Sequence, residues 1–265
     1  MPLVHVPAQA NALLRVIGDL ADRERMSAFA VGGCVRDWRL GVTSRADLDI
    51  AVEGDGIQLA RRVAYALGGS LHTHQQFGTA TVVIPRPHEP RMARDRARVS
   101  GTVRLDLATC RSETYARPAA YPRVSPGTLE GDLFRRDFTL NAMAVALAPS
   151  TFGRLLDPFH GARDLTRRRL RMLHDRSFLD DPTRLLRGVR FAQRFGFAWE
   201  PRTARAACEA LAAGALSWLN AGRLQRELDR LLDEPDPLAC FQALASLLVD
   251  AGRDPAAPIG WRGSA

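Results

Sequence analysis

The sequence predicts an α+β protein, with an α/β region over residues 1–148 and an all-helical region after it. Up to about residue 148, short apolar segments of strand type alternate with amphipathic segments of helical spacing. After Asp157-Pro158 the strand pattern disappears, and apolar residues recur only at helical spacing. A chain of 265 residues, 46% of them hydrophobic, is long enough for one large domain or two small ones.

The elements of the first region follow from apolar spacing and from glycines. Gly32-Gly33 ends the first predicted strand, Gly41 the short helix after it, and Gly68-Gly69 a longer helix. Residues 86–98, with their prolines and arginines, predict an exposed hairpin loop, and 111–127 predict a second loop. Helices are expected over 8–27, 34–40, 56–68 and from 129 to about 145, and strands over 27–31, 47–52, 79–84 and 102–108.

The second region consists of amphipathic segments separated by proline and glycine. The residues from Arg253 onward are expected to fray. Before them, helices are expected over 162–167, 177–180, 182–195, 202–213, 222–233 and 237–249.

All 37 basic residues are arginine, and the sequence contains no lysine. This excludes P-loop nucleotide hydrolases, protein kinases built on a strand lysine, and enzymes that form a Schiff base through lysine. The formal charge of +8 is compatible with a polyanionic partner such as nucleic acid. Any phosphate that this protein binds must be held by guanidinium groups, backbone N–H groups or metal ions.

Cysteine usage and the N-terminus predict a reduced, cytoplasmic protein. The four cysteines have no C-x-x-C spacing, which is typical of free thiols and not of a disulfide framework or a zinc site. No apolar run is long enough to span a membrane, and the N-terminus lacks the basic start and apolar core of a signal peptide.

Three aspartates form the first candidate site. Asp47 and Asp49 lie two residues apart in a predicted strand and therefore on one face of it. Two such carboxylates repel each other unless a cation lies between them, and Mg²⁺ prefers oxygen ligands together with substrate phosphates. Asp106 joins them if its predicted strand is a neighbour. The alternatives are a solvated edge strand and, for Asp106, a salt bridge to Arg104 or Arg111.

A glycine pair precedes these aspartates. Gly32-Gly33 leaves a predicted strand and opens a helix, where backbone N–H groups can approach a phosphate and the helix dipole favours its charge. Arg36 lies one turn into that helix and can reach the same anion. For the glycine pair alone, a plain turn is the alternative.

The segment from Asp180 to Ala192 predicts an amphipathic helix with Asp181 as its N-cap and Pro182 at its first position. The apolar side chains fall on one side of this helix. The other side carries Arg184, Arg187, Arg190 and Arg194. From this pattern alone, the arginines form a solvated basic face.

The segment V-G-G-C-V-R-D at 31–37, followed by D-L-D-I at 47–50, resembles the start of class II tRNA nucleotidyltransferases and bacterial poly(A) polymerases. The block R-R-D-F-T-L-N-A-M-A at 135–144 is close to the R-R-D-F-T-x-N-A motif of that family. The resemblance covers about residues 25–235. It implies a polymerase-β-like nucleotidyltransferase head with a mixed sheet over 1–148, a helical neck over 149–235, and the start of a further helical body over 236–265.

The resemblance implies a division of roles among the residues of the head. Asp47 and Asp49 would bind the catalytic metals, two Mg²⁺ ions, and Asp106 matches the third carboxylate of the family. Gly33 and Arg36 would hold the triphosphate of CTP or ATP.

The R-R-D-F-T block supplies further nucleotide ligands in the family. Arg136, Asp137 and Asn141 would contact phosphate and ribose, and the alternative for the first two is an ion pair on a helix surface. Further on, G-R-L-Q-R-E-L resembles the family's E-R-x-x-x-E segment. There we expect Arg223 and Glu227, spaced i, i+4, to pair and to brace the helices.

The family reads the base of the incoming nucleotide with an E-D-x-x-R motif, which Asp180-Asp181-Pro182-Thr183-Arg184 matches with Asp180 in place of glutamate. The resemblance therefore assigns base recognition to Asp181 and Arg184, with Arg187 and Arg190 completing the nucleotide site. A carboxylate accepts from the exocyclic amine of cytosine or adenine, and a guanidinium donates to a ring nitrogen or carbonyl.

The implied function is template-independent addition of C and/or A to the 3′ end of tRNA, with release of pyrophosphate. The sequence leaves open whether the product is CC, A, CCA or a poly(A) tail on another RNA. A non-catalytic RNA-binding relative and a nucleotidyltransferase acting on small molecules are further alternatives. Only one predicted helix follows the neck. The sequence leaves three explanations open: a truncated chain, a short natural protein, or a second subunit that binds the tRNA.

Overall fold

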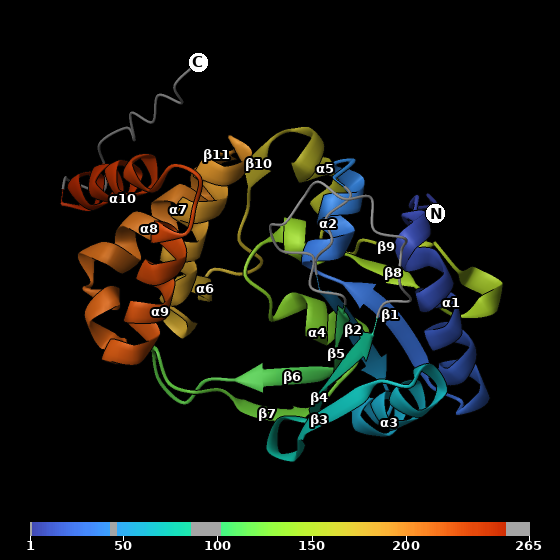
Figure 1. The fold of residues 1–265 in the computed structure, drawn as a ribbon. Coiled ribbons are helices and arrows are strands. Elements are labelled where there is room, and N and C mark those ends of the chain that lie inside the picture. The colour runs from blue at the N-terminus through green and yellow to red at the C-terminus, as the bar shows by residue number, and fades with distance from the viewer. Residues whose placement is uncertain (1, 43–46, 86–101, 253–265) are drawn as a thin grey trace, which may run out of the picture. The chain divides into compact units, whose positions relative to one another are not determined.

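The computed structural model describes residues 2–42, 47–85 and 102–252 (Figure 1). The chain divides into two compact units. The first comprises Met1–Ser112, Val124–Leu133 and Asn141–Pro158, and the second comprises Glu113–Arg123, Phe134–Leu140 and Phe159–Ala265. The division into 1–148, 149–235 and 236–265 stays a prediction. In the described residues, no helix is both long and apolar enough to cross a membrane.

The first unit is built on a seven-stranded sheet in the order β3-β4-β5-β2-β1-β8-β9 (Figure 1). Strands β2 and β5 are parallel and the other neighbours are antiparallel, which confirms the predicted mixed sheet. The strands are β1 Ser27–Val31, β2 Leu48–Glu53, β3 Ser70–His74, β4 Thr79–Pro85, β5 Thr102–Thr109, β8 Ala144–Ala146 and β9 Leu155–Leu156. The expected strands are all present, and β3, β8 and β9 were not expected.

Helices α1 Ala8–Arg23 and α3 Gly56–Leu67 pack against each other and against this sheet. Their apolar faces are buried, as the helical spacing predicts. Gly18 permits the close approach of α1, because a Cβ there would lie 1.8 Å from the carbonyl oxygen of Leu147. The shorter α2 Gly33–Arg39 follows β1 directly.

The second unit is mainly helical, as predicted. Its core is an aromatic cluster in which Phe138 packs against Phe178, Phe191 and Trp199, with ring centroids about 6 Å apart. Its helices are α5 Gly161–Thr166, α6 Ser177–Asp180, α7 Thr183–Phe195, α8 Pro201–Ala212, α9 Ala221–Leu232 and α10 Pro237–Ala251. Two-residue strands, β10 Arg169–Leu170 and β11 Ala198–Trp199, pair in parallel and were not predicted.

Two expectations about local structure are wrong. The helix expected from 129 to about 145 ends early, as α4 Leu129–Phe134, and the chain then forms a short 3₁₀ turn and strand β8. Pairing of β8 with β1 buries all three of its residues, and this tertiary pairing overrides the helical preference of an Ala-rich segment. The loop expected over 111–127 instead contains β6 Arg111–Thr114 and β7 Arg123–Pro126, which form a two-stranded sheet.

Two further expectations, the hairpin loop over 86–98 and the frayed segment after Arg253, lie outside the described residues. Short 3₁₀ helices complete the secondary structure: η1 Gln75–Phe77, η2 Thr139–Asn141, η3 Pro149–Thr151 and η4 Ala215–Trp218.

Candidate nucleotide and metal site

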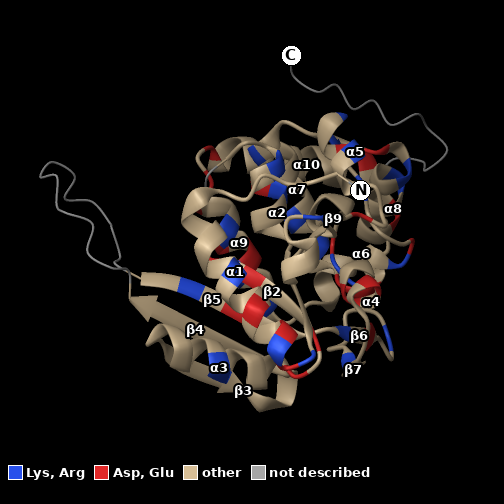
Figure 2. Cartoon of the chain, turned by 90° about the vertical axis from the view of Figure 1, so that its right-hand side faces the viewer, with Lys and Arg blue, Asp and Glu red and all other residues tan. Residues whose placement is uncertain are grey.

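The sheet brings the predicted carboxylates into neighbouring positions. Asp47 immediately precedes β2, and Asp49 is the second residue of that strand. Asp49 lies directly opposite Asp106 in the parallel pairing of β2 with β5. Figure 2 shows the acidic positions of these two strands next to each other on the sheet. The sequence predicts that Asp106 joins the other two aspartates only if their strands are neighbours, and β2 and β5 are neighbours.

Asp106 also forms the ion pair that the sequence offered as an alternative. The Arg104 Nε atom lies 3.0 Å from Asp106 Oδ2, and the Thr81 hydroxyl donates to the same carboxylate. The hydrogen bond from Arg104 to Asp106, and then the charge of Asp106, raise the pKa of Arg104. The charges of Asp47 and Asp49 raise the pKa of Arg104 further, so its guanidinium interacts electrostatically with all three carboxylates.

The donor chemistry of this edge fits Mg²⁺. Asp47 and Asp49 supply only oxygen ligands, and Mg²⁺ is commonly held by one or two carboxylates together with substrate phosphates. Within the described ranges, no three His, Cys, Asp or Glu side chains are grouped as metal ligands. The fit therefore rests on Asp47 and Asp49, and the role of Asp106 as the third catalytic carboxylate stays a prediction.

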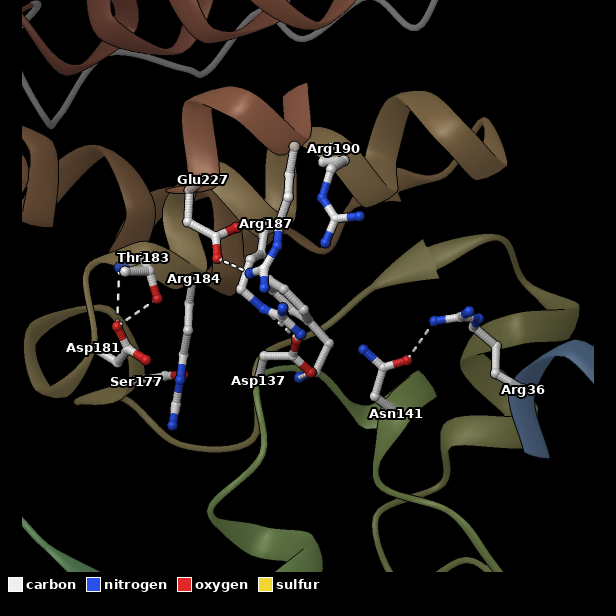
Figure 3. A network of polar contacts seen from close by, with 12 residues as sticks. Arg36, Asp137, Asn141, Ser177, Asp181, Thr183, Arg184, Arg187, Arg190 and Glu227 are labelled. Atoms are coloured by element: carbon white, nitrogen blue, oxygen red, sulfur yellow. Dashed lines mark hydrogen bonds and ion pairs between the residues drawn. The ribbon is translucent and has the colours of Figure 1, made fainter. Parts of the chain in front are cut away.

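The glycine turn and the R-R-D-F-T block meet through a buried hydrogen bond. Gly32 adopts a φ of 74°, which favours glycine, and α2 starts directly after it. From α2, the buried Arg36 donates through Nη1 to Oδ1 of Asn141 at 2.7 Å (Figure 3). Asp37 accepts from the Nε atom of the same guanidinium at 2.9 Å. Two predicted nucleotide ligands, 105 residues apart in sequence, thus lie in contact.

Asp137 is placed by the aromatic residue that follows it. Phe138 is fully buried in the aromatic core of the second unit, which fixes the backbone of the R-R-D-F-T block. Asp137 is itself buried, and its Oδ2 atom accepts from Arg187 Nε at 2.9 Å. The charge of Asp137 raises the pKa of Arg187. The alternative of a surface ion pair is therefore wrong for Asp137; Arg136 is half-buried in the bend before it.

The basic side of α7 is solvated only in part: Arg194 is exposed and Arg187 is half-buried, whereas the other two arginines are buried. Arg184 and Arg190 are only 5% and 9% exposed. Burial, together with the charges of Arg187 and Arg194, lowers the pKa of Arg190. Buried guanidinium groups are costly unless they are hydrogen-bonded or paired, and Arg190 has such a partner: its Nη1 atom lies 3.4 Å from Oε1 of the buried Glu234.

Arg184 is held in a single orientation by neutral acceptors. Its Nη1 donates to the Ser177 hydroxyl and its Nη2 to the carbonyl of Arg135, both at 2.7 Å. His174 Nε2 lies 3.5 Å from Nη1, and burial together with the charge of Arg184 lowers the pKa of His174. The sequence pattern does not single out Ser177 or His174, since neither lies at a motif position.

Asp181 stands beside Arg184 at the start of α7 (Figure 3). Its Oδ1 atom accepts from the backbone N–H and the hydroxyl of Thr183, at 3.0 and 2.6 Å. Arg223 donates to the same oxygen at 2.7 Å. The helix begins at Thr183, one residue later than predicted, but Asp181 does accept an N–H of its first turn.

The expected pair between Arg223 and Glu227 is wrong. Arg223 pairs with Asp181, and Glu227 pairs with Arg230. The i, i+4 spacing permits the expected pair on an isolated helix, but the tertiary structure offers Arg223 a carboxylate from the start of another helix. No local pattern in the sequence indicates this contact, since its partners are 42 residues apart.

The mixed sheet carries the neighbouring carboxylates, and the mainly helical unit carries the buried arginines. Residues 28–171 match the family described as the poly A polymerase head domain. This match covers more than half of the chain, and the chain belongs to this family.

Individual relatives agree with this assignment. The chain is 42% identical over 239 residues to an A-adding tRNA nucleotidyltransferase of Halalkalibacterium halodurans, which covers 89% of this chain and 52% of the relative. It is 41% identical over 207 residues to a CC-adding tRNA nucleotidyltransferase of Deinococcus radiodurans, covering 78% of this chain and 50% of the relative. The chain thus spans about half the length of these relatives.

A solved structure of a CCA-adding enzyme in an apo form has the same fold. It superposes with a TM-score of 0.82 at 36% identity and covers 95% of this chain and 58% of its own. The expected fold class, a polymerase-type head with a mixed sheet followed by helices, is confirmed.

Proposed function

We propose that this protein is a template-independent tRNA nucleotidyltransferase that adds C and/or A to the 3′ end of tRNA. The 3′-hydroxyl of the RNA attacks the α-phosphate of CTP or ATP in line, and pyrophosphate leaves. The names of the relatives support the reaction class, since they include A-adding and CC-adding enzymes. Because the chain spans about half of those relatives, the substrates are part of the proposal.

The observation that carries this proposal is the arrangement of Asp181 and Arg184. A buried, rigidly held guanidinium stands next to a carboxylate whose side chain is 25% exposed. Together, the Asp181 carboxylate offers a hydrogen-bond acceptor and the Arg184 guanidinium offers hydrogen-bond donors to the edge of a base. Cytosine and adenine present an exocyclic amine beside a ring nitrogen, which suits this pair, whereas uracil and guanine present a carbonyl in place of the amine.

The remaining nucleotide contacts are assigned to charged and amide side chains. Arg36 and Gly33 hold the triphosphate in this proposal, and Arg136, Asp137 and Asn141 contact phosphate and ribose. The hydrogen bond from Arg36 to Asn141 supports a shared role for the two motifs. On α7, Arg187 and Arg190 complete the set, and the ion pair of Arg187 with Asp137 supports a common site for these two side chains.

Asp47 and Asp49 would hold Mg²⁺, with two ions proposed, and Asp106 is proposed as the third catalytic carboxylate. When bound, these ions supply charge stabilisation and activation of the attacking hydroxyl. The carboxylates themselves place two exposed, negatively charged groups at the start of β2. Because the sequence contains no lysine, the negative charge of the phosphates would be neutralised by arginine side chains and by these ions.

The test offers the protein tRNA transcripts that lack CCA, end in C or end in CC, each with one labelled nucleotide at a time. Extension with CTP, ATP or both supports the proposal and defines the product. Extension by UTP and GTP as efficiently as by CTP and ATP would contradict it.

A poly(A) polymerase acting on RNA 3′ ends is the second candidate, because the matching family is described by a poly A polymerase head domain. The same assay separates the two candidates. A tRNA nucleotidyltransferase stops after one to three additions, whereas a poly(A) polymerase continues with ATP on a primer that already ends in CCA.

A further inference from the structure

Asp181 is held asymmetrically. Three donors converge on its Oδ1 atom: the Thr183 backbone N–H, the Thr183 hydroxyl and Arg223 Nη2. Within the described part of the chain, no donor contacts Oδ2. A carboxylate rotates freely when only one weak bond restrains it, whereas three donors on one oxygen fix the direction of the other. The fixed Oδ2 is the acceptor that remains for a ligand.

Arg223 is the charged member of these three donors, and it has a second partner. Its Nη1 donates to the carbonyl of Ala119 at 2.9 Å. Its side chain is 13% exposed, so both bonds form in a largely desolvated setting where they are strong. One guanidinium thus joins Asp181 to a segment more than sixty residues earlier in the chain.

The segment at Ala119 is tied to the helical unit at several points. Its N–H donates to the carbonyl of Leu179 at 3.0 Å, and its φ of 56° lies in the left-handed region that alanine rarely adopts. The Arg223 guanidinium also lies 5.6 Å from the ring centroid of Tyr121. Asn220, the N-cap of α9, donates to the Tyr121 hydroxyl at 3.2 Å. These bonds hold a backbone conformation that is unfavourable by itself.

Resting on the proposed function, we propose that Arg223 is a positioning residue that sets base specificity through Asp181. It turns Oδ2 toward the exocyclic amine of the incoming base and couples that orientation to the segment around Ala119. Arg223 itself contacts no reacting atom. Lysine is a poor substitute, because its single ammonium group does not match two acceptors as the planar fork does.

The test compares Arg223→Met and Arg223→Lys with Arg226→Met, a matched control on the exposed side of the same helix. The measured quantity is kcat/KM for the preferred nucleotide divided by kcat/KM for UTP. We expect Arg223→Met to lower this ratio by about tenfold, since an imprecisely held acceptor discriminates poorly. The kcat for the preferred nucleotide should stay within about threefold of wild type, Arg223→Lys should lie in between, and Arg226→Met should match wild type.

A second readout does not need catalysis. Loss of the Arg223 bond should accelerate amide hydrogen exchange at Ala119 in Arg223→Met, and less in Arg223→Lys. An unchanged ratio in Arg223→Met, or an equal loss for all four nucleotides, overturns the proposal, because the residue would then serve folding alone. If Arg223→Met does not fold, an unchanged ratio and unchanged exchange in Arg223→Lys overturn it.

Failure of the proposed function has a different signature. In that case wild type extends no primer with any nucleotide, and the exchange difference at Ala119 persists. The reverse result, an active wild type whose specificity is untouched by Arg223→Met, removes only the positioning role.

Discussion

Arg36 on α2 donates a 2.7 Å hydrogen bond to Asn141, which lies 105 residues later in the R-R-D-F-T-L-N segment. Both side chains are buried. The bond places a guanidinium and an amide side by side, so a single bound anion can be contacted by both. It also means that the loss of either residue disturbs the other.

Asn141→Ala should therefore raise KM for the incoming nucleotide by about tenfold, with a smaller change in kcat. The substitution removes one proposed ligand and one hydrogen-bond acceptor of the Arg36 guanidinium, which keeps its bond to Asp37. Nucleotide titrations of the incorporation rate measure the effect. Asn11→Ala, which removes a half-buried amide from α1, is the control and should leave KM unchanged.

Asp47→Ala should fold and lose nucleotide incorporation by about 100-fold or more, because several kcal/mol of charge stabilisation depend on the bound metal ions. The melting temperature should stay close to that of wild type, since Asp47 is exposed and precedes β2. Asp22→Ala, an exposed acid at the end of α1, serves as the control. Retained incorporation in Asp47→Ala would remove this residue from the metal site.

Asp181→Ala should keep part of its incorporation activity but lose base choice. Without the carboxylate, no acceptor selects an exocyclic amine, and we expect the preference for CTP or ATP over UTP to fall by about 10- to 100-fold. Single-nucleotide incorporation with each of the four triphosphates measures this. Asp175→Ala removes an exposed acid that pairs with Arg202 and lies six residues earlier in the sequence, and it should keep the wild-type preference.

Gly188→Ala should destabilise the helical unit by about 1–3 kcal/mol through overpacking. A Cβ at this position would lie 2.4 Å from the Trp199 ring and 3.0 Å from the Phe138 ring. Denaturant unfolding gives the free energy directly. Gly222→Ala is a helical control whose Cβ would make only ordinary contacts, 3.6 Å from Arg226 and 3.7 Å from Asn220, and it should be neutral or stabilising by less than about 1 kcal/mol. Equal effects of the two substitutions would contradict the packing argument.

His174 should make stability depend on pH. Burial and the nearby Arg184 lower the pKa of His174 below its ordinary value of 6.5. The folded protein therefore prefers neutral histidine, so stability is lost as pH falls through 6.5 toward the lowered value. In melting curves recorded below about pH 6.5, His174→Gln should lose less stability than wild type. His72→Gln, on the exposed strand β3, should behave like wild type.

Local sequence patterns predicted most helices and strands, because each of these elements buries one of its faces and carries apolar residues at the matching spacing. The helix over 182–195 and the strands over 27–31 and 47–52 carry their apolar residues at the spacing that such burial requires. The segment after Phe134 could not be predicted in this way. Strand β8 consists of Ala144–Ala146, whose residues favour helix locally, and only pairing with β1 makes them a strand.

The sequence by itself determined the residue types and motifs of the candidate site: the D-x-D pair, the glycine turn, the R-R-D-F-T block and the D-D-P-T-R helix start. It also determined that any phosphate bound here is held without lysine. The tertiary structure alone decided which guanidinium meets which carboxylate. Arg187 pairs with Asp137 and Arg223 with Asp181, across 50 and 42 residues. Such ion pairs depend on how whole helices and strands pack against each other. Helical spacing in the sequence predicts contacts only between side chains one turn apart on the same helix.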